Sequence, residues 1–206
     1  MTKLILFHIF IFSEKLLKNK IVFNNTKFAK AMTNEEVEKI INEVFPGLTL
    51  YYRDTELSSE LISNYQPKQI ILEPAFIDCS HMGGYPTGNM RYLIASNKAA
   101  DLGRLQPEVA KYGMMVINAG SFFKVLDVYE IDGYTQVLLL HIPSQAVDFF
   151  KITNSNLEQT VIDKCRALFE KRMTDEVIPE LNEDSWKQRI DFPLGMSKEG
   201  KLYFQE

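Results

Sequence analysis

The side chains best able to carry chemistry lie in one short stretch, Cys79-Ser80-His81-Met82-Gly83-Gly84-Tyr85-Pro86-Thr87-Gly88-Asn89. It combines a thiol, an imidazole and three glycines between two segments that resemble strands. Successive backbone amides in a glycine-rich loop can bind an anion, because glycine allows positive φ and close backbone approach. The candidate ligand-binding residues are this loop and the charged residues at its ends: Glu73, Asp78, Cys79, His81, Gly83, Gly84, Gly88 and Arg91.

The loop does not match a known phosphate-binding motif. It contains no Gly-Lys-Ser/Thr, and it joins strand to strand. A phosphate-binding loop instead precedes a helix whose N-terminus faces the phosphate. The alternative is a long connection that needs glycine for its turns.

Cys79 and His81 could form a thiolate–imidazolium pair, with Asp78 or Glu73 orienting the imidazole. Side chains two positions apart in an extended segment point to the same side, so contact is possible. Catalytic cysteine and histidine, however, usually come from separate elements, so the sequence predicts no catalytic residue. It also predicts no metal site and no cofactor, because it has neither His-x-x-x-His nor Cys-x-x-Cys.

Arg91 could bind a ligand carboxylate or phosphate, or form an internal ion pair with one of the many acidic side chains. Asp127 falls on a face that the pattern predicts to be buried, where a carboxylate needs a partner or a shifted pKa. Lys124 and His141 are expected to form a cross-strand pair. Exposure at a sheet edge is the alternative explanation for these last three residues.

The hydrophobic pattern predicts the elements that position these residues. Apolar residues at helical spacing predict helices at 34–45, 55–65 and 156–173, the first opened by the capping box Thr33-Asn34-Glu35-Glu36 and the second capped by Asp54 or Thr55. Strands are expected at 48–53, 68–73, 90–96, 114–118, 122–131 and 134–142, and a helical turn at 108–111.

The last two strands are separated by only Asp132-Gly133, which is typical of a type I′ hairpin. A two-residue turn fixes the register. The expected pairs are Ile131 with Tyr134, Tyr129 with Gln136, Asp127 with Leu138, Val125 with Leu140, Phe123 with Ile142 and, on the reverse face, Lys124 with His141. Apolar pairs on both faces imply strands that are covered on both sides.

This order of elements favours an α+β fold, with a mainly antiparallel sheet of about five to six strands packed by about three helices. Residues 32–206 are expected to form a single domain, with Cys165 in its core. Trp186, Phe192 and Leu194 are expected to pack a C-terminal arm against that domain, together with Tyr203 and Phe204.

Residues 1–31 differ in composition and form a non-core N-terminal extension. The apolar run Leu4 to Phe12 resembles a secretory signal, but Ser13-Glu14-Lys15 follows it where a signal peptide needs small residues. It is also too short to span a bilayer. The favoured interpretation is a misassigned start, with Met32 as the first residue.

Charge and cysteine content narrow the class of function. The first 31 residues hold six lysines and one glutamate, which leaves 17 basic and 26 acidic side chains in 32–206. An acidic domain repels phosphate backbones and anionic lipid, so neither nucleic acid nor a membrane is an expected partner. Cys79 and Cys165 form no disulfide framework, which favours the cytoplasm.

These observations lead to two hypotheses. The first is a non-enzymatic protein-binding domain with an acidic surface, such as an antidote-like partner of a basic protein. The alternative is a small-molecule or anion-binding domain, which could be an enzyme, that uses loop 78–91.

Overall fold

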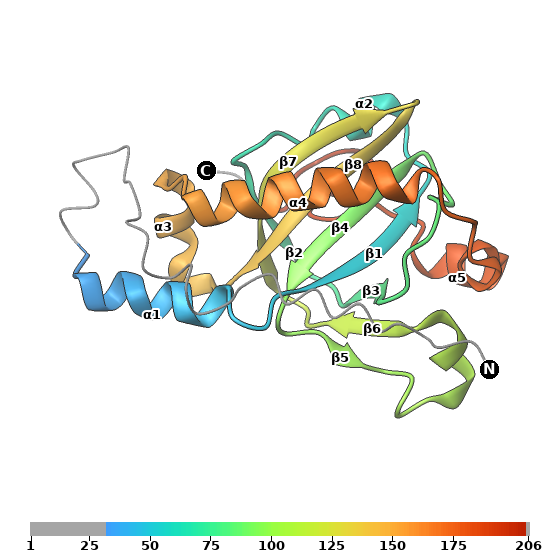
Figure 1. Ribbon diagram of the computed structural model, residues 1–206, viewed down its shortest axis with the longest axis horizontal. Helices are drawn as coiled ribbons and strands as arrows, with labels where there is room; N and C mark the ends of the chain where they lie inside the picture. The colour runs from blue at the N-terminus through green and yellow to red at the C-terminus, as the bar shows by residue number, and fades with distance from the viewer. Residues whose placement is uncertain (1–31, 205–206) are drawn as a thin grey trace.

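The computed structural model describes residues 32–204, so the predictions about 1–31 lie outside the described residues (Figure 1). The helices are α1 (Asn34–Val44), α2 (Ser59–Ile62), α3 (Val147–Ile152), α4 (Asn156–Arg172) and α5 (Asp184–Arg189), with 3₁₀ helices η2 (Pro107–Tyr112), η3 (Ser144–Ala146) and η4 (Pro179–Asn182). The strands are β1 (Thr49–Thr55), β2 (Ile70–Glu73), β3 (Ile77–Ser80), β4 (Met90–Ser96), β5 (Ala100–Asp101), β6 (Met114–Ile117), β7 (Ser121–Ile131) and β8 (Tyr134–Ile142).

All eight strands form one mixed sheet in the order β2-β7-β8-β4-β1-β3-β6-β5. Its centre is a parallel pair, β4 and β8, while the other neighbouring strands are antiparallel. The predicted sheet of five to six mainly antiparallel strands with three helices is therefore wrong. The sequence pattern missed β3, β5, α3 and α5, which are short, and could not reveal a parallel pairing between distant strands.

Local signals in the sequence fix the two longer helices. In α1 the Thr33 side chain accepts from the Glu36 backbone N–H, and the Glu36 carboxylate accepts from the Thr33 N–H. Ser155 and Glu158 form the same reciprocal box at the start of α4. Each box satisfies backbone donors that a helix N-terminus leaves unpaired. Both predicted helices are confirmed.

The predicted helix at 55–65 is mostly wrong. Strand β1 continues to Thr55, which pairs with Met90 of β4, and α2 begins only after the N-cap Ser58. Asp and Thr are good N-caps in isolation, but here the pairing of β1 with β4 overrides that local preference.

The β7–β8 hairpin follows the predicted register from Ile131 back to Asp127 and then departs from it. A β-bulge between Val125 and Asp127 shifts the remaining pairs by one residue, so Phe123 lies opposite His141 and Lys124 opposite Leu140. The predicted Lys124–His141 pair is thus wrong. A bulge inserts one unpaired residue into one strand, and the alternation of the sequence does not mark its position.

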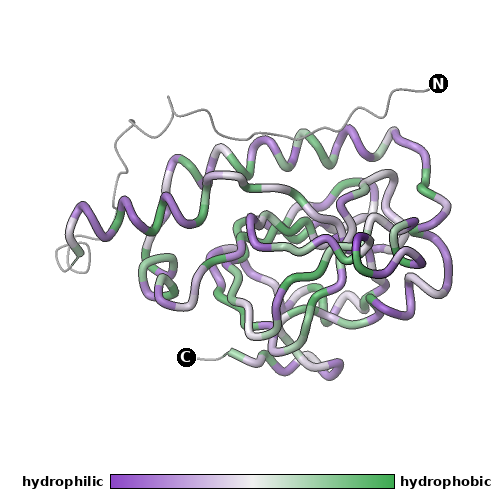
Figure 2. The backbone as a smooth tube through the Cα atoms, turned by 90° about the horizontal axis from the view of Figure 1, so that it is seen from below, coloured by the Kyte–Doolittle hydropathy of each residue, from purple (hydrophilic) through white to green (hydrophobic). Residues whose placement is uncertain are grey.

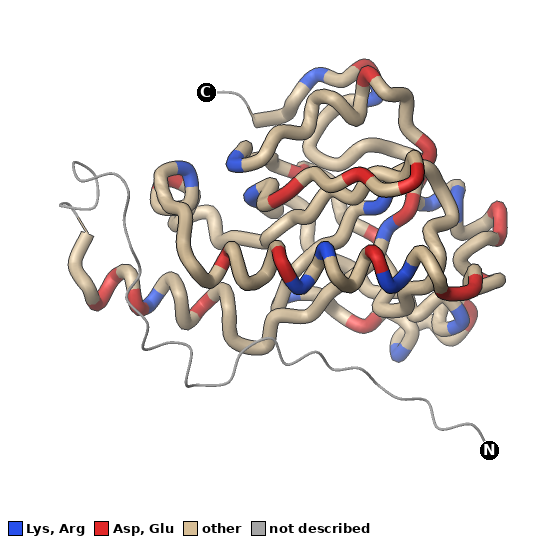
Figure 3. The backbone as a smooth tube through the Cα atoms, turned by 45° about the horizontal axis from the view of Figure 1, so that its top comes forward, with Lys and Arg blue, Asp and Glu red and all other residues tan. Residues whose placement is uncertain are grey.

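Helices cover one face of the sheet. The side chains of α1, α3 and α4 pack with Leu93, Leu138 and Leu140 in a core that includes Cys165, which is fully buried as predicted. In Figure 1, α4 crosses in front of the sheet. Figure 2 shows hydrophobic and hydrophilic residues alternating along this helix, while Figure 3 shows both signs of charge on it.

A buried ion pair joins this helical layer to the sheet. Lys124 of β7 donates to Glu158 Oε1 of α4 at 2.9 Å and to the carbonyl of Thr153, and the two charged side chains are only 2% and 5% exposed. Burial lowers the pKa of Lys124 and raises that of Glu158, because both ions have lost their hydration. The prediction that a sheet edge exposes Lys124 is therefore wrong.

The opposite face is covered by the chain after α5, which we call the C-terminal segment (residues 190–204). Its Leu194 and Met196 are buried in a second core with Tyr65 and Tyr92. Tyr65 donates to the Leu194 carbonyl at 2.7 Å, and the Leu194 N–H donates to Tyr92 at 3.0 Å. The predicted arm therefore packs as expected through Leu194, whereas Tyr203 is 48% exposed.

His141, near the end of β8, makes stability depend on pH. Its ring packs against Phe123, its Nδ1 lies 2.8 Å from Ser96 Oγ, and burial followed by the charge of Lys98 lowers its pKa from 6.5 to about 4. The neutral ring therefore stabilises the fold above about pH 6.5, and this contribution is lost as the pH falls toward 4.

When the pH falls from 7 to 4, we expect the free energy of unfolding to decrease by about 2–3 kcal/mol more in the native protein than in His141→Asn. Asparagine can keep a hydrogen bond to Ser96 but does not titrate. Urea denaturation of both proteins at pH 7, 5.5 and 4 measures the difference. If the free energy of unfolding depends on pH in the same way in both proteins, the prediction is wrong.

Candidate functional site

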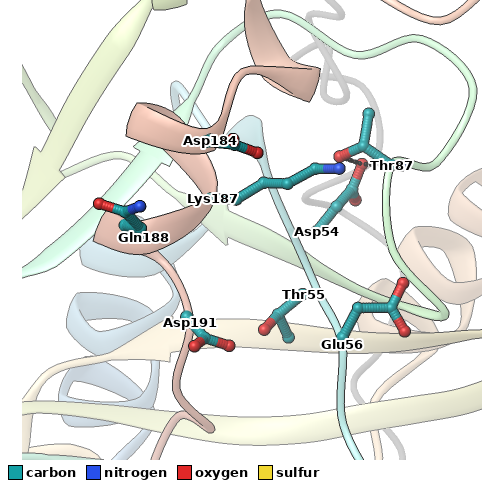
Figure 4. A pocket seen from close by; sticks show the side chains of 8 residues that line it. All are labelled: Asp54, Thr55, Glu56, Thr87, Asp184, Lys187, Gln188 and Asp191. Atoms are coloured by element: carbon teal, nitrogen blue, oxygen red, sulfur yellow. Dashed lines mark hydrogen bonds between the residues drawn. The ribbon is translucent and has the colours of Figure 1, made fainter.

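A polar pocket of about 150 Å³ lies where three separate segments meet (Figure 4). The end of β1 and the residue after it form one wall, the glycine-rich loop a second, and α5 with the residues beyond it a third. The lining residues are Asp54, Thr55, Glu56, Thr87, Asp184, Lys187, Gln188 and Asp191.

Helix α5 presents the polar wall because its two sides differ. Asp184, Lys187, Gln188 and Asp191 recur at intervals of three and four residues, which places them on one side of the helical turn. Trp186 points the other way, where it is 2% exposed and stacks on Tyr112 with ring centroids 5.2 Å apart. Tyr112 also donates to Glu183. These contacts hold α5 in place beside the pocket.

Asp54 is fixed in the pocket wall by Arg91 of the neighbouring strand β4. The guanidinium donates to both carboxylate oxygens, Nε to Oδ1 at 2.6 Å and a second nitrogen to Oδ2 at 2.7 Å. Its third donor binds the carbonyl of Gly84 at 3.0 Å, and the Thr87 N–H donates to Asp54 Oδ2. Arg91 therefore forms an internal ion pair, which was one of the two alternatives that the sequence predicted for it.

The glycines of the loop allow it to lie close against its neighbours. A Cβ atom on Gly88 would lie 2.5 Å from the Thr55 carbonyl oxygen, and one on Gly83 would lie 2.4 Å from Cζ of the Tyr52 ring. Gly84 similarly approaches the Glu176 carbonyl. Positive φ occurs at none of the three, so they serve close packing rather than a left-handed amide cradle.

The structure disperses the other predicted ligand-binding residues. Glu73 is 3% exposed and accepts from the Gly195 and Ala75 N–H groups, so it anchors the C-terminal segment. Asp78 lies 3.6 Å from Arg189. None of these residues lines the pocket, and of the predicted loop only Thr87 does.

Cys79 and His81 do not form a reactive pair. The Cys79 thiol is fully buried and donates to the Met115 carbonyl at 3.5 Å, and burial raises its pKa far above that of a free thiol. His81 is exposed beside Gly113. A protonated thiol that solvent cannot reach is a poor nucleophile, so Cys79 is a core residue and not a reactive one.

Thr55 provides an unsatisfied polar group in the pocket wall. It is 5% exposed, and its Oγ1 has no hydrogen-bond partner among the described residues. In Figure 4 the hydroxyl points to the side where Asp191 lies. Buried hydroxyls are rarely left without a partner, because losing water without replacement costs about 1–3 kcal/mol.

The charge of the pocket is negative. Glu56, Asp184 and Asp191 form no ion pair within residues 32–204, Asp54 is neutralised by Arg91, and Lys187 is the single cationic side chain in the lining. Within the same range no group of three or more His, Cys, Asp or Glu is arranged to hold a metal ion. The described helices include none long and apolar enough to cross a bilayer.

Sequence reasoning missed most of this site. It treated Asp54 and Thr55 as the start of a helix and assigned no role to Lys187 or Asp191. One available signal was the polar stripe of α5 opposite Trp186. The convergence of that stripe with the end of β1 depends on tertiary structure, which no local pattern reveals.

No protein-family model matches the chain, and no curated protein matches it. Solved structures that match include the type III effector XopAI from Xanthomonas axonopodis pv. citri (13% identity, TM-score 0.40, 47% of this chain and 44% of that one). Others are the Vis toxin, an ADP-ribosyltransferase from Vibrio splendidus (14%, 0.39, 60% and 64%), and Exoenzyme S from Pseudomonas aeruginosa (11%, 0.38, 45% and 47%).

The match to XopAI and to Exoenzyme S spans less than half the length of those chains. TM-scores of about 0.4 at these identities do not establish a shared fold, so no activity follows for this chain from the likeness. Exoenzyme S was solved with a human 14-3-3 protein and carba-NAD, so one of these structures is a protein complex. A basic partner for this chain stays a prediction.

The matched structures do contradict the first functional hypothesis, a non-enzymatic protein-binding domain with an acidic surface. Those named for an activity are ADP-ribosyltransferases, which are enzymes. The hypothesis is therefore not retained. The alternative, a small-molecule or anion-binding domain at loop 78–91, fits these neighbours better.

Proposed function

We propose that this protein binds a small molecule in the pocket between the end of β1, the glycine-rich loop and α5. The observation that carries the proposal is the convergence of polar side chains from these three segments around a hollow that also contains the orphaned Thr55 hydroxyl. Ligand sites typically combine a preformed concavity with a few converging polar groups.

The size of the pocket limits what it holds. Sites that enclose a whole drug-sized ligand measure roughly 300–1,000 Å³, whereas this pocket measures about 150 Å³. It therefore accommodates a group of a few heavy atoms, which is either a very small ligand or one end of a larger one. The proposal retains the glycine-rich loop in part, because Thr87 lines the pocket while Gly88 brings the loop against β1.

A thermal-shift screen of residues 1–206 with amines, amino acids, sugars and nucleotides tests the proposal. NAD belongs in the panel because several matched structures are ADP-ribosyltransferases. A ligand at 100 times its Kd stabilises the native state by about 2.7 kcal/mol, which raises Tm by several degrees. We expect at least one compound to produce such a shift.

Two tryptophan variants locate the binding site. Gln188→Trp should fill the pocket and abolish the shift, whereas Asn182→Trp, at an exposed position of η4 outside the pocket, should keep it. Both variants should retain the circular dichroism spectrum of the native protein. The proposal is overturned if no compound raises Tm, or if the shift, with NAD or any other compound, survives Gln188→Trp unchanged.

A further inference from the structure

We infer that the group bound in this pocket is an organic cation, an ammonium or guanidinium, held by Glu56, Asp184 and Asp191. The inference rests on the proposed function, since it names the chemical class of ligand for the same pocket. It replaces the anion that the glycine-rich loop suggests in the sequence.

The distribution of charge is the first argument. Three acidic residues line the pocket without a cationic partner in residues 32–204, against the single ammonium of Lys187. Charges near a protein surface interact more strongly than in bulk water, because the effective dielectric constant there is lower. A cation that enters the pocket is therefore attracted to these carboxylates, while an anion is repelled by them.

The groups at the glycine-rich loop that could bind an anion are already engaged. Arg91, the basic residue predicted for that role, donates hydrogen bonds to Asp54 and to the Gly84 carbonyl. The Thr87 N–H also donates to Asp54. The loop therefore offers its donors to the protein's own carboxylate, and the open side of the pocket presents acceptors.

Thr55 is the second, independent argument. Its hydroxyl is buried, lacks a partner and lies in the wall on the side of Asp191 (Figure 4). A hydroxyl oxygen can accept from a ligand N–H, which ammonium and guanidinium groups supply in several directions. Such a donor would satisfy the one buried polar side-chain atom of the lining that has no partner among the described residues.

Lys187 shows where the ligand cation belongs. In Figure 4 its side chain runs from α5 across the pocket, and its ammonium ends beside Thr87 and Asp54. No hydrogen bond or ion pair holds that ammonium to the described residues, so it occupies the pocket without being fixed there. We therefore regard Lys187 as an internal competitor that lowers the affinity for an external cation.

An organic cation fits better than a metal ion. The acidic side chains of the described range are not close enough together to ligate a metal. A volume of about 150 Å³ also exceeds the need of a bare ion and suits a planar or tetrahedral group of several atoms. Charge-assisted hydrogen bonds to carboxylates then give such a group both affinity and orientation.

Four matched probes test the inference by calorimetry at low salt: butylguanidinium, butylammonium, 1-butanol and butyrate, which have short alkyl chains and differ in charge. We expect the two cations to bind and the alcohol and anion not to bind. Asp191→Asn should weaken butylguanidinium binding about tenfold, equivalent to 1.4 kcal/mol, and Lys187→Met should strengthen it. Glu38→Gln removes an exposed carboxylate of α1 that does not line the pocket, so it should leave butylguanidinium binding unchanged.

The outcomes separate this inference from the proposed function. If butanol or butyrate binds the native protein but not Gln188→Trp, while the two cations do not bind the native protein, the pocket is a ligand site of another class and the inference is wrong. If butylguanidinium binds Gln188→Trp and Glu38→Gln as tightly as the native protein, the pocket is not the site and both proposals fail. Equal weakening by Asp191→Asn and Glu38→Gln would show a general charge effect and overturn the inference as well.

Discussion

Arg91→Met should lower the free energy of unfolding by about 3–5 kcal/mol, because it leaves the Asp54 carboxylate buried without its counter-ion. Asp54 and Arg91 are 5% and 1% exposed in their side chains, and two hydrogen bonds of 2.6 and 2.7 Å join them. The variant also leaves the Gly84 carbonyl without its donor. Urea denaturation measures the loss directly.

The double variant Asp54→Asn/Arg91→Met supplies the control for this pair. It carries neither buried charge, so it should be more stable than the sum of the two single changes predicts, by at least about 1 kcal/mol. Additive losses would show that the two side chains do not act as a pair. A loss below about 1 kcal/mol for Arg91→Met would contradict the burial of the carboxylate.

Glu158→Ala should have an effect of similar size at the second buried ion pair. It removes the counter-ion of the buried Lys124, at a cost of about 3–5 kcal/mol, and also the acceptor of the Ser155 N–H that completes the capping box of α4. The matched control is Gln159→Ala, one residue along the same turn and exposed, which should change stability by about 0.5 kcal/mol or less.

A second variant separates the two roles of Glu158. Glu158→Gln keeps an oxygen for the capping box but loses the charge, so combining it with Lys124→Met removes the buried pair and spares the cap. We expect the double variant to be more stable than Glu158→Ala in the same denaturation experiment. If the two are equally unstable, the loss comes from the missing ion pair that both variants share, and neither the cap nor an unpaired Lys124 charge adds to it.

The sequence predicts best the elements whose signals are local. The apolar stripes of both helices, together with the capping box of the first, predicted α1 and α4 nearly to the residue, and the run Met90 to Ser96 predicted β4 in full. These features depend on neighbours within four residues along the chain. The sequence did not predict interactions between distant segments, among them the parallel β4–β8 pair and the bulge that moves Lys124 away from His141.

The candidate site shows the same division. Arg91 was correctly given an internal ion pair as one of its two alternatives, because an acidic chain offers many partners for a buried arginine. Its actual partner Asp54 stands opposite it only once β1 pairs with β4. Likewise, Thr87 was within the predicted loop, but its neighbours Lys187 and Asp191 are about a hundred positions away in the sequence.

The C-terminal segment also bears on how the chain folds. Arg53, Tyr65 and Glu73 from the first third of the described chain bind backbone groups of Phe192, Leu194 and Gly195, at sequence separations of 139, 129 and 122 residues. Loop-closure entropy must be overcome before contacts at such separations form, which slows folding. During synthesis, the apolar face formed by Tyr92, Ile94 and their neighbours therefore stays uncovered until residue 196 has left the ribosome, so association with chaperones is expected to concentrate in that interval.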